Sequence, residues 1–165
     1  MSCWPSPAKQ NRYSEMKAEE TIMSQVTVLA VPVFSTLCNE GFRLRREVFI
    51  VEQNVPADME FDADDLTAFH FVAVVSGEVC GTLRVIYAED CVKIGRVAVA
   101  NPWRGKGVAS AMIRAAMETH GQARDNRFHL AAQSDKISMY ERFGFKAYGE
   151  EFFDVGIPHY NMKNF

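Results

Sequence analysis

The segment that most constrains the fold joins an alternating apolar run to a glycine-rich bend and then to an amphipathic helix. The apolar run covers residues 92–99, the bend contains Gly105 and Gly107, and helical spacing continues to His120. Glycine lets a backbone approach a ligand closely because it carries no Cβ. A helix that starts directly after such a bend points free N–H groups and its positive dipole end at that ligand. This order of elements predicts a strand–loop–helix unit that binds phosphate.

The residues of this bend exclude two common nucleotide-binding motifs. A Walker loop needs lysine followed by serine or threonine, whereas Lys106 is followed by Gly107. A dinucleotide fingerprint needs a third glycine, and Ser110 stands at that position. The pattern that fits is Arg-x-x-Gly-x-Ala, which runs from Arg104 to Ala109.

Size and composition favour one globular domain. The chain has 165 residues, of which 48% are hydrophobic, and this length is enough to bury a real core. A net charge of −3 argues against a nucleic-acid partner, which usually requires a basic surface. No apolar run is long enough to span a bilayer, and the start lacks the features of a secretory signal. We therefore expect no membrane partner and a cytoplasmic location.

Cysteine and histidine spacing does not indicate a metal site. The cysteines are scattered without a C-x-x-C pair, and no histidine stands at ligand spacing from them. We expect no metal, and we expect the cysteines to be small buried hydrophobes. They are Cys3, Cys38, Cys80 and Cys91.

Hydrophobic periodicity predicts an α/β fold of the α+β type. Residues 1–22 are polar and are expected to form a loosely ordered extension, followed by a single domain over residues 23–165. Strands are predicted at 26–33, 69–75, 79–86, 92–99, 128–132, 145–155 and 159–163. Helices are predicted at 42–52, 105–120 and 137–143. This order implies a mixed sheet with helices on both faces.

Several of these segments together resemble a known family. The Arg-x-x-Gly-x-Ala pattern is similar to the acyl-CoA pyrophosphate loop of the GCN5-related N-acetyltransferases (GNAT). Residues 140–145 resemble the family's Tyr-Glu-x-x-Gly-Phe segment, and residues 48–53 resemble the Val-Phe-x-x-Glu-Gln start of its ElaA-like branch. The tail from Gly149 to Met162 also resembles that branch. The resemblance covers residues 26–165.

The resemblance implies a mostly antiparallel sheet of six to seven strands that binds acetyl-CoA. The cofactor would enter where the strand ending at Val99 diverges from the strand near Leu130. Gln133 stands where many family members carry an asparagine that helps to hold the cofactor. The other residues expected at the cofactor are Val97, Ala98, Val99, Arg104, Gly105, Lys106, Gly107, Val108 and Ala109.

Four residues are candidates for proton transfer. The resemblance implies that Tyr140 protonates the leaving thiolate, whereas its type alone favours an amphipathic core residue of a short helix. His70 and His159 each fit either a buried structural histidine or a base, because imidazole titrates near neutral pH. Glu52 fits either a solvated helix end or a base that acts through water.

An acidic run covers residues 58–65 and contains no lysine or arginine. One interpretation is a plain solvated loop. The other is a negative rim, including Glu60 and Asp62, that attracts a cationic amine. With His159, these residues form the predicted substrate site.

Three functions are consistent with this sequence. The first is acetyl-CoA-dependent acetylation of a primary amine on a small molecule or a peptide. The second is a non-catalytic module that binds or senses acyl-CoA, since a fold does not fix its function. The third is an interaction module whose loop binds a partner's phosphate. A homodimer stays open, because an exposed C-terminal strand could pair with a second copy.

Overall fold

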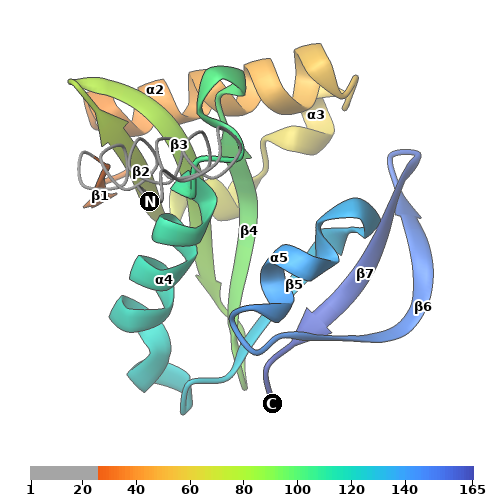
Figure 1. The fold of residues 1–165 in the computed structure, drawn as a ribbon. Helices are drawn as coiled ribbons and strands as arrows, with labels where there is room; N and C mark the ends of the chain where they lie inside the picture. The colour runs from red at the N-terminus through yellow and green to blue at the C-terminus, as the bar shows by residue number, and fades with distance from the viewer. Residues whose placement is uncertain (1–25) are drawn as a thin grey trace, which may run out of the picture.

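A computed structural model describes residues 26–165. The extension expected over residues 1–22 and Cys3 lie outside these residues. The described chain forms one seven-stranded sheet in the order β1-β2-β3-β4-β5-β7-β6 (Figure 1). Its strands are β1 (Thr27–Val31), β2 (Phe69–Val75), β3 (Glu78–Tyr87), β4 (Val92–Val99), β5 (Phe128–Gln133), β6 (Lys146–Asp154) and β7 (Ile157–Lys163). The predicted fold class is confirmed.

The pairing of β4 with β5 creates an opening in the sheet. All other neighbouring strands are antiparallel, whereas β4 and β5 are parallel. Only Val92 and Lys93 of β4 pair with β5, opposite Phe128 and His129. Past these pairs the two strands diverge, as the upper part of β4 shows in Figure 1. The predicted divergence of the strand ending at Val99 from the strand near Leu130 is therefore confirmed.

Helical segments connect the strands. They are α2 (Thr36–Arg45), η1 (Arg46–Glu52), α3 (Ala57–Glu60), η2 (Ala63–Leu66), η3 (Asn101–Trp103), α4 (Val108–His120), η4 (Gly121–Arg124), η5 (Ser134–Lys136) and α5 (Ile137–Glu141). The predicted start of the first helix at Phe42 is wrong, because Ser35 caps it a turn and a half earlier by accepting a hydrogen bond from the Cys38 amide. Its second half, η1, is a π-helix.

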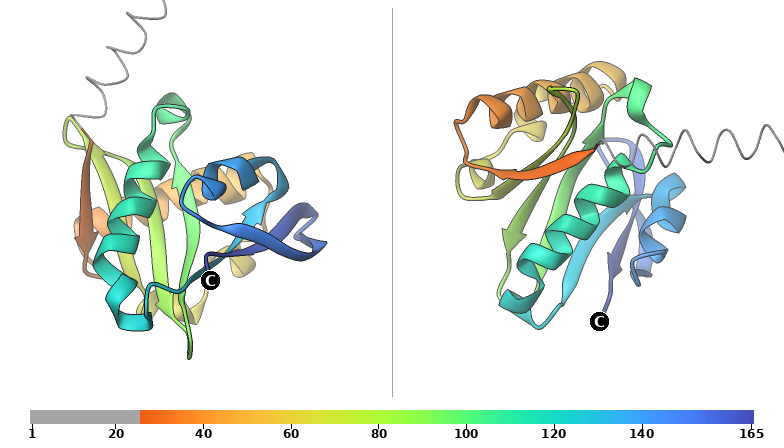
Figure 2. Two further views of the ribbon diagram at one scale, coloured as in Figure 1. Left: turned by 60° about the horizontal axis from the view of Figure 1, so that its bottom comes forward. Right: turned by 60° about the vertical axis from the view of Figure 1, so that its left-hand side comes forward.

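Helices cover both faces of the sheet, as predicted (Figure 2). The alternation of side chains at the end of β4 shows which helix covers which face. Ala98 packs against Leu44 of α2 and Val48 of η1. Its neighbours Val97 and Val99 pack against the main core, to which α4 contributes.

Helix α4 lies very close to β3, and a glycine makes this approach feasible. A Cβ added at Gly81 would lie 2.8 Å from Met112 Cε and 2.9 Å from Val108 Cγ1. Both side chains are fully buried. The close packing of α4 on β3 fixes its first turn beside the end of β4, where the sheet opens.

Two further expectations concern burial and membrane spans. Cys38, Cys80 and Cys91 are buried and free, as predicted for small hydrophobes. Within residues 26–165, the helices are all too short or too polar to cross a bilayer.

Candidate active site

The glycine bend before α4 presents a run of unpaired backbone donors. Gly105 and Gly107 have φ values of 74° and 80°, in the left-handed region that favours glycine. Gly107 caps α4 without a side-chain hydrogen bond, and the first amide to bond back to it is that of Ala111. Among the described residues, no backbone carbonyl accepts from the amides of Gly105–Ser110. These amides, at the positive end of the helix dipole, form a site for an anion.

The charged side chains of the bend are engaged elsewhere. Arg104 Nη2 lies 2.7 Å from Glu52 Oε2, and Arg104 Nε donates to the Val99 carbonyl at 2.9 Å. The Arg104 amide donates to the Asn101 carbonyl. The Arg104 side chain is therefore bonded to Glu52 and Val99 in this structure, and it joins the bend to η1. Its predicted contact with phosphate stays a prediction.

Lys106, the second cation of the bend, packs on a neighbouring aromatic ring. Its Nζ lies 5.1 Å from the centroid of the Trp103 ring. Such a cation–π contact holds the ammonium at the surface of the bend. The amides are thus the donors that the bend leaves available for an anion.

The open edge of β4 presents backbone groups of Val99. The Ala100 amide donates to the Cys80 carbonyl of β3, and Ala98 pairs with Thr82 on the same side. Because backbone direction alternates along a strand, Val99 points its N–H and C=O groups towards the opening, where the carbonyl already accepts from Arg104 Nε. Val97 lies at a shift in the β3–β4 register, where this alternation is interrupted. The prediction that Ala98 contacts the cofactor is therefore corrected, since its backbone bonds to β3 and its side chain packs on Leu44 and Val48.

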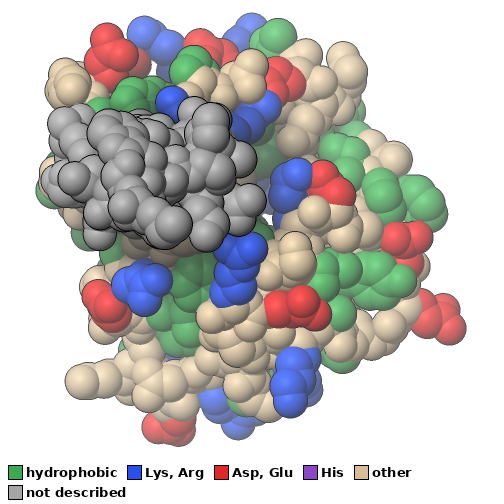
Figure 3. Space-filling view, in the orientation of Figure 1, with side chains coloured by type: hydrophobic (Ala, Val, Ile, Leu, Met, Phe, Trp, Pro, Cys, Tyr) green, Lys and Arg blue, Asp and Glu red, His purple; other side chains and the backbone are tan. Residues whose placement is uncertain are grey.

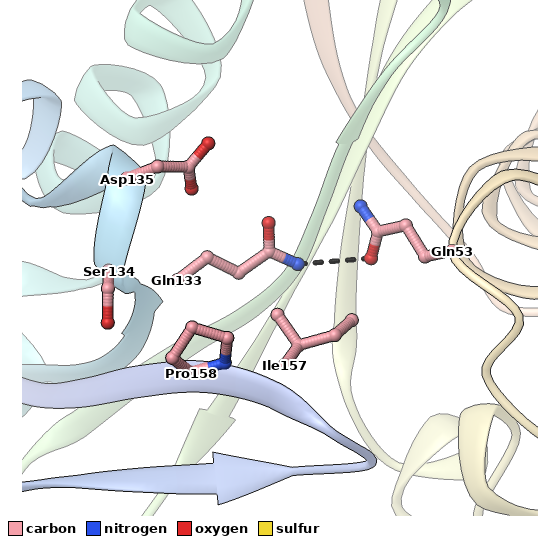
Figure 4. A pocket seen from close by; sticks show the side chains of 6 residues that line it. All are labelled: Gln53, Gln133, Ser134, Asp135, Ile157 and Pro158. Carbon is pink, nitrogen blue, oxygen red and sulfur yellow. Dashed lines mark hydrogen bonds between the residues drawn. The ribbon is translucent and has the colours of Figure 1, made fainter.

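A pocket of about 420 Å³ lies where the ends of η1, β5 and the β6–β7 hairpin meet. Gln133 Nε2, at the end of β5, donates to Gln53 Oε1 at 3.0 Å and bridges the pocket (Figure 4). Ile157 and Pro158 lie beneath this hydrogen bond. The lining residues are Gln53, Gln133, Ser134, Asp135, Ile157 and Pro158.

His159 follows this pocket on β7, opposite Gln133 in the strand register. Its Nδ1 donates to the Ile157 carbonyl at 2.8 Å, and its ring stacks on Phe152 at 5.8 Å between centroids. A carbonyl can only accept, so the proton is on Nδ1 and Nε2 is the acceptor of the neutral ring. The structure thus places His159 beside the pocket that contains Gln133.

Tyr140 lies on α5 and is buried, with 7% of its surface exposed. Its ring packs edge-on against Phe145, with 6.3 Å between centroids. Burial raises the pKa of Tyr140 from its ordinary value of 10 to about 12. Its hydroxyl therefore keeps its proton throughout the physiological range and can act as a donor.

His70 is a structural residue, and its predicted role as a base is corrected. It is buried on β2, which β3 separates from β4 and the opening. Its Nε2 donates to the Asp65 carbonyl at 2.8 Å, and the Phe42 ring packs against it. His70 therefore helps to hold the acidic segment on the sheet.

The acidic run forms ion pairs with three arginines rather than a free negative rim. Arg45 Nε donates to Glu60 Oε1 and Arg45 Nη1 to Asp65 Oδ1, both at 2.6 Å. The Arg84 guanidinium binds both oxygens of Asp62, at 2.6 and 2.7 Å. We call this group the ionic cluster. Its members are Arg45, Glu60, Asp62, Asp65, Arg84 and Arg96.

The predicted roles of Glu60 and Asp62 in attracting substrate are therefore corrected. Glu60 is 2% exposed, and Arg96 Nε also lies 3.0 Å from its carboxylate. For Asp65, burial acts to raise the pKa, but hydrogen bonds and charge from Arg45 and Arg84 overcome it and lower the pKa to about 2. Arginines pair with the buried carboxylates of Glu60 and Asp65, and Arg84 also holds both oxygens of Asp62, whose side chain is 36% exposed.

Sequence reasoning missed the arginines of the ionic cluster and five of the six pocket residues, namely Gln53, Ser134, Asp135, Ile157 and Pro158. One signal was present for the arginines. Arg84 interrupts the apolar strand Thr82–Ile86, where a charge is stable only with a partner. The pocket residues carried no such signal, because tertiary structure brings them together from the ends of η1, β5 and β7.

The chain belongs to the GNAT acetyltransferase family, because a model of the acetyltransferase (GNAT) domain matches residues 13–164. Within this family it belongs to the ElaA-like branch. Protein ElaA of Escherichia coli is 34% identical over 127 residues, which cover 73% of this chain and 82% of the relative. Its crystal structure superposes with a TM-score of 0.73 and 30% identity, covering 84% of this chain and 97% of that one.

A second relative supports the same family. It is described as an uncharacterized N-acetyltransferase, YjcF of Bacillus subtilis, and is 32% identical over 124 residues. The match covers 74% of this chain and 89% of the relative. A crystal structure from Lactobacillus plantarum, described as a putative N-acetyltransferase, has a TM-score of 0.75 at 22% identity over 84% of this chain and 96% of that one. At this identity it shows the fold alone.

Proposed function

We propose that this chain transfers an acetyl group from acetyl-CoA to the primary amine of a small molecule or a peptide. The observation that carries this proposal is the opening between β4 and β5, which ends at the unpaired amides of Gly105–Ser110. An extended ligand with a phosphate at one end matches this arrangement. Membership of the GNAT family supports acetyl transfer in general terms.

The chain offers separate groups for separate parts of acetyl-CoA. The amides of Gly105–Ser110 would bind the pyrophosphate. The open edge of β4 around Val99 would bind the amide groups of the pantetheine arm, as a neighbouring strand would. Gln133, at the end of β5, would add a side-chain amide close to the reacting end.

Acetyl transfer would proceed by direct attack. The amine nitrogen forms a bond to the thioester carbon, and the carbon–sulfur bond breaks. The Tyr140 hydroxyl would donate a hydrogen bond to the leaving sulfur and stabilise its developing negative charge, because burial keeps the phenolic proton in place. The attacking nitrogen loses a proton to a base, for which Glu52 and His159 are the two candidates beside the pocket.

Glu52 and Arg104 couple the two halves of the site. Their ion pair, at 2.7 Å, joins the end of η1 to the bend that precedes α4. Both side chains are 40% exposed, so solvent and ligands can reach them. We propose that this pair sets the position of the Glu52 carboxylate at the mouth of the opening.

A turnover screen tests this function directly. The chain is incubated with acetyl-CoA and a panel of amines and short peptides, and free thiol is followed with mass spectrometry of the product. The proposal predicts thiol release that depends on an amine and a product heavier by one acetyl group. Tight acetyl-CoA binding without turnover would instead support a sensing module. Equal affinity for simple phosphates and CoA would support a phosphate-binding interaction module.

A further inference from the structure

The pocket bridged by Gln53 and Gln133 lies where an acceptor amine would enter. It adjoins the end of β5, and its other walls come from the end of η1 and the start of β7. Its volume of about 420 Å³ lies towards the small end of the range found for small-molecule sites. A compact ligand therefore matches it better than a long chain.

The walls of this pocket are apolar or neutral apart from one carboxylate. Ile157 and Pro158 are half-buried and form the apolar wall (Figure 4). The Gln53 and Gln133 amides bond to each other, and the Ser134 hydroxyl donates to Glu151 outside the lining. Asp135 is the carboxylate.

The carboxylate in the pocket lining and the Glu52 carboxylate at its mouth each have a cationic partner. Asp135 pairs with the ammonium of Lys136, its neighbour in the chain. Glu52, which precedes the lining residue Gln53, pairs with Arg104. The pocket therefore offers at most one carboxylate to a cationic ligand, and only in competition with a partner already in place.

The acidic run does not supply further negative charge to the pocket. Its residues Glu60, Asp62 and Asp65 are held by arginines of the ionic cluster. The pocket lining contains no residue of the run. On the face shown in Figure 3, acidic side chains are scattered among basic ones rather than gathered in one patch.

We infer that the acceptor is an amine with a single positive charge and a compact apolar substituent that packs on Ile157 and Pro158. Polyamines and lysine-rich peptides should be poorer substrates, because a second ammonium would meet no unpaired carboxylate in the pocket lining. This inference rests on the proposed acetyltransferase function and narrows its substrate class.

A matched pair of amines tests the inference on the parent protein. Butylamine and 1,4-diaminobutane have the same carbon chain and differ by one terminal ammonium. We expect kcat/KM to be higher for butylamine by about tenfold or more. The reason is that the second ammonium of the diamine would lose water against an apolar wall. A preference for the diamine overturns the inference but leaves acetyl transfer standing. Absence of thiol release with every amine overturns the proposed function as well.

Two variants locate the selectivity. Ile157→Asp places a carboxylate in the apolar wall and should shift the butylamine-to-diamine ratio towards the diamine by about tenfold. Ala147→Asp places the same charge on the same hairpin, at an exposed residue that pairs with Met162 and does not line the pocket. It should leave the ratio unchanged.

An equal shift in both variants would mean that charge acts at long range, and no shift in Ile157→Asp would remove this wall from the acceptor site. Either result contradicts the assignment. If circular dichroism shows Ile157→Asp to be unfolded, Pro158→Asp tests the same wall, because Pro158 also lines the pocket.

Discussion

The ionic cluster and the glycine bend before α4 differ in whether their polar groups have partners within the protein. In the cluster, arginines and carboxylates pair with one another, from the buried Arg45–Glu60 pair at 2.6 Å to the partly exposed Arg96–Asp62 pair at 3.3 Å. In the bend, the amides of Gly105–Ser110 are left without a backbone acceptor among the described residues. The first region is complete without a ligand, whereas the second is not.

This difference distinguishes charged groups that stabilise the fold from polar groups that can bind a ligand. Buried polar groups in proteins are nearly always hydrogen-bonded, so a charged cluster that is fully paired needs no other explanation. A run of unpaired donors at a helix N-terminus is a site for an anion. Ion pairing therefore assigns Glu60 to the scaffold, although its sequence pattern suggested a substrate site.

Removing the central arginine should produce the largest effect. Arg45→Met leaves Glu60 and Asp65 buried with one cation fewer, and we expect the free energy of unfolding to fall by about 3–5 kcal/mol. Urea denaturation measures this change. The control is Arg43→Met on the same helix, where the side chain is 70% exposed and, among residues 26–165, pairs with Glu40 alone. A similar loss in both variants would show that the cluster does not stabilise the fold.

Tyr140→Phe tests the catalytic side of the comparison. The substitution keeps the packing against Phe145 but removes the donor, so kcat should fall by about 10²–10⁴-fold while acetyl-CoA affinity stays the same. Steady-state kinetics and calorimetry measure the two quantities. Tyr148→Phe removes an exposed hydroxyl that bonds to His129, and it should leave kcat unchanged. An unchanged kcat in Tyr140→Phe would remove this residue from the mechanism.

The pH dependence of stability sharpens the comparison further. Arg45 and Arg84 lower the pKa of Asp65 to about 2 from 3.8, so its stabilisation is complete above pH 3.8 and is lost as the pH falls towards 2. Asp65→Asn should therefore cost about 2 kcal/mol at pH 7. Because asparagine does not titrate, the difference in the free energy of unfolding between parent and variant should become smaller as the pH falls from about 4 to about 2. A difference that stays constant over this pH range would contradict the assignment of this stability to the lowered pKa of Asp65.

Local sequence signals predicted the strands and the glycine bend well, and the family resemblance predicted the opening. The bend was predictable because Gly105, Gly107 and the start of α4 adjoin one another in the chain. The roles of Glu60 and Asp62 were not, since their partners Arg45 and Arg84 lie 15 and 22 residues away. Charge pairing across such separations depends on tertiary structure.

The helix before the acidic run shows a second limit. The spacing of Leu44 and Val48 correctly predicted a helical segment. It did not predict that the segment starts at Thr36 or that Arg46–Glu52 forms a π-helix, because the Ser35 cap and the wider turn do not alter the apolar pattern. The wider turn ends at Glu52 and Gln53, which is how both residues come to lie at the mouth of the site.

The central claim is that the unpaired amides of the bend bind acetyl-CoA, and one calorimetric comparison tests it most directly. Gly107→Val places a branched side chain at φ 80° where the backbone must approach phosphate. Gly77→Val imposes the same backbone strain at φ 85° in the turn between β2 and β3, with open space around it. Our account predicts that acetyl-CoA affinity falls by about tenfold or more in Gly107→Val and is unchanged in Gly77→Val. A folded Gly107→Val variant that binds acetyl-CoA as tightly as the parent would contradict it.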